Sequence, residues 1–307
     1  MYNKISISQR LFLLLERTSR YLFNKLGFGN RQILKFLTKS KIFLRRNIKA
    51  TTLNQLVINL AEHCNFSCYS CSVFSCLAEP YFPDLETAEK DLKHLSKLFN
   101  RNIPSIHFSG GEPLLNPKFP DFARITRLYF PDSIIRIITN GLLLLSQKNL
   151  FWESVKEYNL TISPTKYPGI NWDKIEEKAN KNGVKFIYYD YSEKSKKTSR
   201  KFSLDLSGSQ NINKSFKECM NNNCTMLKNG RIAPCNLVFS INHFNTYFKK
   251  NIPISLKDSI DIYKVESMKE IVDFAHKPIP LCAYCKSMGK EIIGDWRKSE
   301  RKIEEWI

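Results

Sequence analysis

The sequence predicts an α/β protein built from repeated βα units with a parallel sheet. Short apolar runs alternate with helix-spaced segments between residues 56 and 189, as expected when helices connect parallel strands. The motifs that could carry chemistry directly follow these apolar runs. A length of 307 residues is enough for one large core and a smaller accessory domain. These observations together favour a βα barrel with its site at one mouth.

The expected strands are short apolar runs, and the expected helices carry apolar residues at helical spacing. The strands are expected at residues 56–60, 106–108, 134–138, 160–163 and 184–189, with a weaker sixth strand at 202–206. The helices between them are expected at residues 85–98, 119–129, 150–158 and 172–182. The carboxyl ends of parallel barrel strands lie at one mouth, so the motifs that follow them are expected to meet there.

Three cysteines spaced C-x3-C-x2-C follow the first expected strand, at Cys64, Cys68 and Cys71. Grouped cysteines in an intracellular protein usually bind metal. Three thiolates leave one corner of a four-iron cluster open to another ligand. The alternatives are a zinc site or three buried thiols. The segment Gly110-Gly111-Glu112-Pro113, which follows the second expected strand, favours the cluster.

The cysteine run and the glycine segment together resemble those of radical S-adenosylmethionine (SAM) enzymes, and the resemblance covers residues 56–190. It implies a partial (β/α)6 barrel of the TIM type, a 4Fe–4S cluster on the three cysteines, and SAM chelated to the open iron. In this family an electron from the cluster cleaves SAM to a 5′-deoxyadenosyl radical, which abstracts hydrogen from the substrate. The expected electron donor is a flavodoxin or ferredoxin.

The resemblance also implies which residues bind SAM. Gly110, Gly111 and Glu112 would hold the methionine amino group, because glycines let the backbone approach a ligand closely and Glu112 adds charge near a cationic cofactor. Other family members often place polar groups for the carboxylate and the ribose at later strand ends. Here those groups would be Thr139, Asn140 and Ser163, with turn or capping roles as an equal alternative.

One position departs from the family pattern. The residue before the third cysteine is usually large and apolar and packs near the adenine, whereas this chain has Ser70. Adenine packing would then fall to Tyr69 or Phe74. No residue can be identified from the sequence as the catalytic group that acts on the substrate.

A second cysteine group lies in the last third of the chain, at Cys219, Cys224, Cys235, Cys282 and Cys285. The Asn229-Gly230 pair between two short apolar runs predicts a β-hairpin. Such a hairpin brings Cys224 and Cys235 to the same end of two paired strands. The C-x2-C turn at Cys282 can supply two more thiolates to one metal centre.

This second group resembles the auxiliary-cluster domain of radical SAM enzymes (SPASM or twitch) in its short, single-cluster form. Cys219 fits the family spacing before Gly230 and Cys235, while Cys224 fits the hairpin geometry, so the choice between them stays open. An auxiliary 4Fe–4S cluster with four protein ligands would be closed to substrate and would transfer electrons. Structural zinc is the alternative, because four thiolates also suit tetrahedral zinc.

The net charge of +19 is concentrated at the N-terminus. Residues 1–50 hold 12 of the 48 basic residues and one acid, Glu16. We expect a basic amphipathic helical extension at 1–52, the barrel at 53–212 and the auxiliary domain at 213–307. The extension could pack on the barrel or contact an anionic membrane surface peripherally. Nucleic acid is disfavoured because no reader motif accompanies the charge.

The sequence predicts a cytoplasmic protein. No apolar run has the roughly 18 residues of a membrane-spanning helix, and nine cysteines without a secretion signal fit a reducing compartment. We expect a radical SAM oxidoreductase or modifying enzyme acting on a small molecule, a sugar derivative or a peptide. The alternative is a non-catalytic metal-binding scaffold with structural zinc that docks to a partner or a membrane.

Overall fold

The computed structural model describes residues 52–189, 198–222 and 224–307, which belong to one compact unit, Thr52–Ile307. The predicted basic extension at 1–52 and its membrane contact lie outside the described residues, apart from Thr52. No helix in the described part of the chain combines the length and apolarity needed to cross a bilayer.

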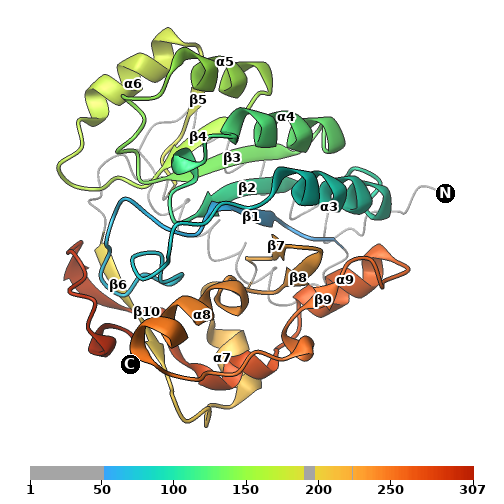
Figure 1. Ribbon diagram of the computed structural model, residues 1–307, viewed down its shortest axis with the longest axis vertical. Helices are drawn as coiled ribbons and strands as arrows, with labels where there is room; N and C mark the ends of the chain where they lie inside the picture. Colours follow the sequence, from blue (N-terminus) through green and yellow to red (C-terminus); the bar gives the residue numbers. More distant parts are fainter. Residues whose placement is uncertain (1–51, 190–197, 223) are drawn as a thin grey trace, which may run out of the picture. The chain divides into compact units, whose positions relative to one another are not determined.

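Parallel strands alternate with helices through the first half of the described chain (Figure 1). The strands are β1 (Leu56–Ala61), β2 (Ser105–Gly110), β3 (Ile134–Thr139), β4 (Thr161–Pro164) and β5 (Lys185–Phe186). The helices are α3 (Leu85–Leu98), α4 (Phe119–Tyr129), α5 (Asn149–Glu157) and α6 (Trp172–Lys181), with a 3₁₀ turn, η2, at Pro113–Leu115. The predicted α/β fold of the barrel type is confirmed, because successive strands pair in parallel and in chain order.

Local sequence explains where these helices begin and what they bury. The Asp84 carboxylate caps α3 by accepting a hydrogen bond from Thr87 N at 2.8 Å. The spacing of Leu92 and Leu95 then buries both side chains fully. Because each crossover from strand to parallel strand has the same hand, α3 to α6 lie along one side of β1–β5 (Figure 1). The other side of these strands is left for the site.

The second half of the described chain extends the same sheet and adds a small second one. The remaining strands are β6 (Thr198–Leu204), β7 (Met226–Lys228), β8 (Arg231–Ala233), β9 (Ile260–Asp261) and β10 (Cys285–Asp295). The helices are α7 (Ile212–Glu218), α8 (Leu237–Phe248) and α9 (Met268–Ala275), and the 3₁₀ turns are η3 (Leu256–Asp258), η4 (Pro280–Tyr284) and η5 (Ile303–Glu305). The main sheet has the order β5-β4-β3-β2-β1-β7-β8-β9.

The predicted hairpin at Asn229-Gly230 is confirmed. β7 and β8 pair antiparallel with Lys228 opposite Arg231, and both turn residues have positive φ, as a two-residue hairpin requires. β7 also pairs in parallel with β1, so the hairpin joins the main sheet. The predicted boundary between residues 212 and 213 stays a prediction.

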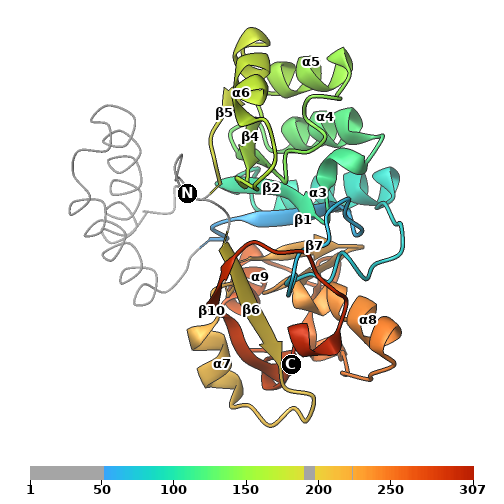
Figure 2. The same ribbon diagram turned by 90° about the vertical axis from the view of Figure 1, so that its left-hand side faces the viewer.

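The prediction of a sixth barrel strand at 202–206 is wrong. Residues 202–204 of that segment belong to β6, which pairs antiparallel with β10 in a separate two-stranded sheet (Figure 2). The sixth parallel strand is β7, on the opposite side of β1. A parallel strand buried on both faces needs consecutive apolar residues. Met226 and Leu227 provide them, whereas apolar and polar residues alternate at 202–206.

The C-terminal part has an apolar core of its own, formed mainly by α8, η4 and Trp306. Phe74 from the cysteine loop inserts into it, and the Phe74 ring centroid lies 5.4 Å from Phe244 and 5.9 Å from Trp306. Phe74 has a φ of 53°, so the loop is bent sharply to bury this ring. The loop that carries the first three cysteines is therefore anchored on the C-terminal core.

Candidate functional site: a thiol-lined cavity at the strand ends

A cavity of about 270 Å³ lies at the carboxyl ends of the central strands. The predicted site residues on its wall are Cys64, Cys68, Cys71, Gly110, Gly111, Thr139 and Asn140. Ala61 pairs with Gly110 at the ends of β1 and β2, so the segments that follow these strands leave the sheet at the same edge. The structure thus brings the cysteine run and the glycine segment to one cavity.

Two of the three sulfurs have polar neighbours close by in space. The Cys64 sulfur accepts a hydrogen bond from Phe66 N at 3.3 Å, and Asn140 Nδ2 donates to it at 3.6 Å. Cys71 Sγ lies 3.3 Å from Ser75 Oγ. Burial raises the pKa of the Cys64 thiol above its ordinary value, although the Phe66 N–H opposes this shift. A metal binding here must displace that proton.

Cys68 is contacted by two aromatic side chains that the sequence did not point to. Trp296 Nε1 donates to Cys68 Sγ at 3.2 Å, and the Tyr167 hydroxyl oxygen lies 3.5 Å from the same sulfur. Burial, with a smaller contribution from the Cys68 thiol, raises the pKa of Tyr167 well above its ordinary value. The phenol therefore keeps its proton at neutral pH.

The two glycines bring the end of β2 against the backbone that leads into the cysteine loop. Gly111 N donates to Ala61 O at 2.8 Å, and Glu112 N donates to His63 O at 3.1 Å. A Cβ on Gly110 would lie 2.1 Å from Ala61 O, and one on Gly111 would lie 1.9 Å from His63 O. Besides any approach to a ligand, the glycines are needed for this contact within the protein.

Glu112 does not line the cavity, and its carboxylate is fully buried. The carboxylate accepts hydrogen bonds from Leu114 N at 3.1 Å, Thr139 Oγ1 at 2.7 Å and Asn140 N at 2.9 Å. Burial raises the pKa of Glu112 to about 7, while these three donors oppose the shift. Any effect of Glu112 on a ligand would pass through Thr139 and Asn140, which do line the cavity.

The structure does not bring Tyr69, Phe74 or Ser163 to the wall of this cavity. The Arg297 guanidinium covers the Tyr69 ring, 3.8 Å from its centroid. Ser163 is fully buried, and its hydroxyl accepts a hydrogen bond from Arg136 at 3.4 Å. The prediction that Tyr69 or Phe74 packs on adenine therefore has no support in this geometry.

Ser70, the residue that departs from the family pattern, is fully buried beneath the second sheet. Its hydroxyl accepts a hydrogen bond from Phe202 N of β6 at 2.9 Å, and its N–H donates to Glu305 Oε2 at 3.4 Å. A large side chain would displace β6 and the C-terminal turn. The small residue is therefore explained by packing against the C-terminal part.

A second cavity, of about 30 Å³, is lined by four of the C-terminal cysteines. They come from the end of α7, the start of α8, η4 and the start of β10, and they are Cys219, Cys235, Cys282 and Cys285. Burial raises the pKa of each of these thiols, that of Cys219 to about 11. Each of these thiols must lose its proton when it binds a metal, and the raised pKa makes that loss less favourable.

Cys224 lines the first cavity instead of the second. Gln55 Nε2 donates to its sulfur at 3.6 Å. The hairpin geometry that favoured Cys224 as an auxiliary ligand is real, but the side chain faces the other site. Three residues, Ser72, Asn221 and Asn236, line both cavities and form a shared wall.

The donor types in the two cavities suit iron–sulfur chemistry, since thiolates are the ligands of such clusters. Four cysteines line the first cavity, namely Cys64, Cys68, Cys71 and Cys224, and four others line the second. Across the described residues, no three His, Cys, Asp or Glu side chains are grouped closely enough to hold a single metal ion. The suitability of the two cavities for iron–sulfur clusters is therefore judged from the residues that line them, not from a preformed site for one metal ion.

Residues 58–163 match the model of the radical SAM superfamily. The match covers about a third of the chain, so this segment is similar to the radical SAM domain. The matched segment begins in β1 and ends in β4, so it includes the three cysteines and the glycine segment.

Similar proteins include a GTP 3',8-cyclase from Chlorobaculum tepidum, 31% identical over 119 residues, which are 38% of this chain. The chain spans only 32% of that relative. Among solved structures, BtrN in complex with AdoMet and 2-DOIA is 16% identical over 78% of this chain and 95% of that chain, with a TM-score of 0.46. Streptococcus suis SuiB bound to S-adenosylmethionine is 14% identical over 66% of this chain and 60% of that chain, with a TM-score of 0.30.

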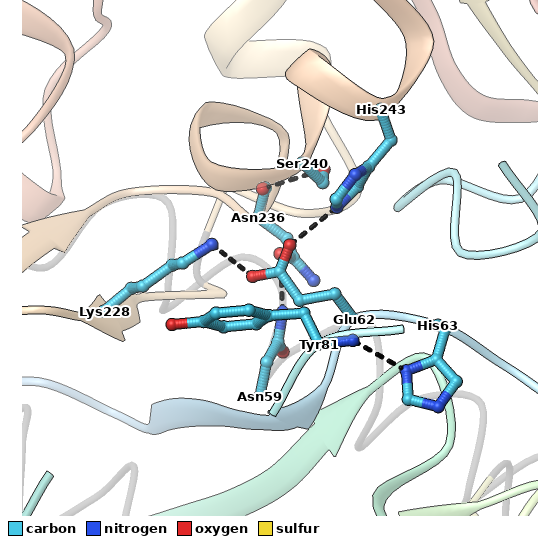
Figure 3. Close-up of polar contacts among 8 residues, drawn as sticks. All are labelled: Asn59, Glu62, His63, Tyr81, Lys228, Asn236, Ser240 and His243. Atoms are coloured by element: carbon cyan, nitrogen blue, oxygen red, sulfur yellow. Dashed lines mark hydrogen bonds and ion pairs between the residues drawn. The ribbon is translucent and has the colours of Figure 1, made fainter. Parts of the chain in front are cut away.

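The loop that carries Cys64, Cys68 and Cys71 is tied to the C-terminal part by a buried carboxylate, Glu62 (Figure 3). Glu62 pairs with Lys228 of the hairpin, and His243 Nε2 of α8 lies 2.6 Å from its other oxygen. Burial raises the pKa of Glu62, but His243 and Lys228 outweigh it and lower the value overall. Nearby, Tyr81 N donates to His63 Nδ1 at 3.2 Å. The base of the loop is thus fixed from both sides.

Sequence reasoning missed Glu62, Tyr167, Trp296 and the position of Cys224. Glu62 lies two residues before Cys64, and a charged residue at a strand end could have been noticed. The aromatic residues carry no local signal, because Trp296 is 228 residues from the sulfur that it contacts.

Proposed function

We propose that this protein is a radical SAM enzyme that cleaves SAM reductively and abstracts hydrogen from a substrate. Cys64, Cys68 and Cys71 would hold a 4Fe–4S cluster. When bound, that cluster supplies the electron that cleaves the sulfonium of SAM into methionine and a 5′-deoxyadenosyl radical. The observation that supports the proposal most is the meeting of three thiols with Gly110 and Gly111 on one cavity wall.

The residues around the cavity would bind and orient the ligands. Gly110 and Gly111 present backbone rather than side chains, which suits recognition of an amino group by carbonyl oxygens. Asn140 donates to Asn65 Oδ1 at 2.7 Å and to the Cys64 sulfur, so it would hold the cysteine loop in place. A flavodoxin or ferredoxin as electron donor and a cytoplasmic location remain parts of the proposal.

The substrate would be a small molecule, a sugar derivative or a peptide. Gln55, Asn221 and Asn236 offer amide groups to the cavity, which suit a ligand rich in hydroxyl groups. His107 also lines the wall, and burial, followed by the charge on Arg136, lowers its pKa to about 4. The imidazole is therefore neutral at pH 7 and can accept or donate a hydrogen bond.

Reductive SAM cleavage tests the proposed reaction directly. We expect the protein, reconstituted anaerobically and given dithionite and SAM, to form 5′-deoxyadenosine measured by chromatography. The Cys68→Ala variant removes one of three cluster ligands and is expected to fall to assay background. Wild-type protein that yields no more 5′-deoxyadenosine than this variant would instead favour the non-catalytic metal-binding scaffold.

We further propose that Cys219, Cys235, Cys282 and Cys285 hold an auxiliary 4Fe–4S cluster. They line one cavity together, and it shares a wall with the first. Four protein ligands would leave no corner for substrate, so this cluster would transfer electrons. The separation of Cys224 from this group favours Cys219 as the fourth ligand.

Metal content of paired variants distinguishes the two candidate ligands. In a background with Cys64, Cys68 and Cys71 all changed to alanine, we expect about four irons to remain per chain. Adding Cys219→Ala should remove most of that iron, whereas adding Cys224→Ala should leave it in place. Equal losses in the two variants would contradict the assignment, and zinc in place of iron would mean a structural zinc site.

A further inference from the structure

The end of the chain pairs with the cysteine loop. Ser299 N donates to Ser67 O at 2.9 Å, and Tyr69 N donates to Arg297 O at 3.1 Å. Between these bonds, Cys68 and Lys298 form an antiparallel bridge. The segment 296–299, which follows β10, is therefore fixed in register beside Cys68, the second cysteine of the triad Cys64, Cys68 and Cys71.

This register places the Trp296 indole beside Cys68. The indole nitrogen lies 3.2 Å from Cys68 Sγ, and its ring centroid is 5.7 Å from that of Tyr167, at an interplanar angle of 84°. Phe66 packs against both rings, 5.6 Å from Trp296 and 5.0 Å from Tyr167. Three aromatic rings thus hold one N–H and one O–H close to a single sulfur.

We propose that Trp296, assisted by Tyr167, is a positioning residue that raises the reduction potential of a cluster bound at Cys68. This inference rests on the proposed function, since it needs the cluster on the triad. An indole N–H can only donate, and a hydrogen bond to a charged acceptor is stronger than one to a neutral acceptor. Reduction adds negative charge to the cluster and its thiolates, so the donor stabilises the reduced form more than the oxidised form.

The sulfurs of the other two cysteines have hydrogen-bond partners that are close in the chain or lie just after β3. Cys64 accepts from Phe66 N and Asn140, and Cys71 lies beside Ser75. Among the described residues, the hydrogen-bond partners of the Cys68 sulfur come from beyond β4. The C-terminal part also reaches Cys71, where Trp306 Nε1 donates to the backbone oxygen at 3.0 Å, but its polar contact with a sulfur is that of Trp296 with Cys68. The placement of Trp296 depends on β10, and therefore on correct folding of the C-terminal part.

The Trp296→Phe variant keeps an aromatic ring and removes the N–H. We expect the midpoint potential of the triad cluster, followed by electron paramagnetic resonance during anaerobic redox titration without SAM, to shift to a more negative value. Tyr167→Phe should shift it in the same direction by less, because the oxygen lies farther from the sulfur. The titrations use the full chain with the auxiliary ligand changed, Cys219→Ala, so that one cluster dominates the signal.

Trp152→Phe is the matched control. Trp152 lies in α5 and is buried, and its indole nitrogen has no hydrogen-bond partner among the described residues. This variant removes the same N–H away from the sulfurs and should leave the midpoint unchanged. Iron and sulfide content is measured for every variant before titration.

The outcomes separate this inference from the proposed function. An unchanged midpoint in a fully loaded Trp296→Phe variant overturns the role of Trp296, while SAM cleavage by the wild type leaves the proposed function intact. If Trp296→Phe fails to load iron, the loaded Tyr167→Phe variant decides, and an unchanged midpoint there overturns the inference. Wild-type protein that loads no iron on the triad overturns both.

Discussion

Replacing Gly111 with alanine is expected to destabilise the protein by more than about 3 kcal/mol and to reduce iron loading on the triad. The new Cβ would lie 1.9 Å from His63 O and 2.8 Å from Glu62 O, closer than such atoms can approach. Both oxygens belong to the backbone, so no side chain can rotate away to relieve the contact. The segment before Cys64 would have to move, although the Glu62 contacts with Lys228 and His243 hold it.

Urea unfolding of the metal-free protein, together with iron content after reconstitution, measures this effect. Gly169→Ala is the matched control, because nothing lies within 4 Å of its added Cβ and only the φ of +77° is unfavourable. We expect that control to lose about 1–2 kcal/mol and to load iron normally. Similar losses in the two variants would show that the loop yields easily and that crowding at Gly111 is unimportant.

The second large effect is expected at Glu112. Glu112→Ala removes the acceptor for Leu114 N, Thr139 Oγ1 and Asn140 N, and leaves a hole at the end of β3. Buried donors without partners are costly, so we expect a loss on the order of 3–5 kcal/mol in urea unfolding. Glu112→Gln keeps the size and one acceptor oxygen, so it should cost less than the alanine variant.

The Glu112→Gln variant also tests the pKa of the buried carboxyl. Burial raises this pKa to about 7 from an ordinary value of 4.5, so the folded protein binds a proton that the unfolded chain has released between these values. The stability that comes from this group is fully present below about pH 4.5 and is lost as the pH rises through 7. Relative to the Gln variant, the wild type should lose on the order of 3 kcal/mol between pH 4.5 and pH 8.

Urea titrations at pH 5, 6, 7 and 8 on both proteins check this expectation. A stability difference that stays flat across this range would mean that the three donors keep Glu112 ionised despite its burial. In that case the alanine variant should still be the less stable of the two, because its loss comes from unpaired donors rather than from protonation.

The barrel strands and the residues that follow them could be predicted because their signals are local. The strands before Cys64 and Gly110 are apolar runs, and in a parallel sheet their carboxyl ends lie at one edge whatever the rest of the chain does. The hairpin at Asn229-Gly230 could be predicted for the same reason, because a turn with two successive positive φ values favours Asn and Gly. Each of these features depends on a few neighbouring residues.

The position of the sixth parallel strand and the cavity that each C-terminal cysteine lines depend instead on pairing between distant segments. The segment at 202–206 and the hairpin strand β7 are both short, and only the apolar Met226 and Leu227 suit the place beside β1. Spacing alone could not choose between Cys219 and Cys224. The fold around α7 and the hairpin turns the first toward the C-terminal cavity and the second toward the triad.

Short local patterns predicted the parallel α/β fold, the thiol triad with its glycine segment, and a resemblance to radical SAM enzymes. These follow from residue types at fixed short spacings, which local backbone geometry converts into strand ends and turns. Only the packing of distant segments shows that Glu112 is a buried acceptor, that Ser70 packs under β6, and that Trp296 reaches Cys68. Such contacts form only when segments far apart in the chain are packed together, and no local pattern encodes them.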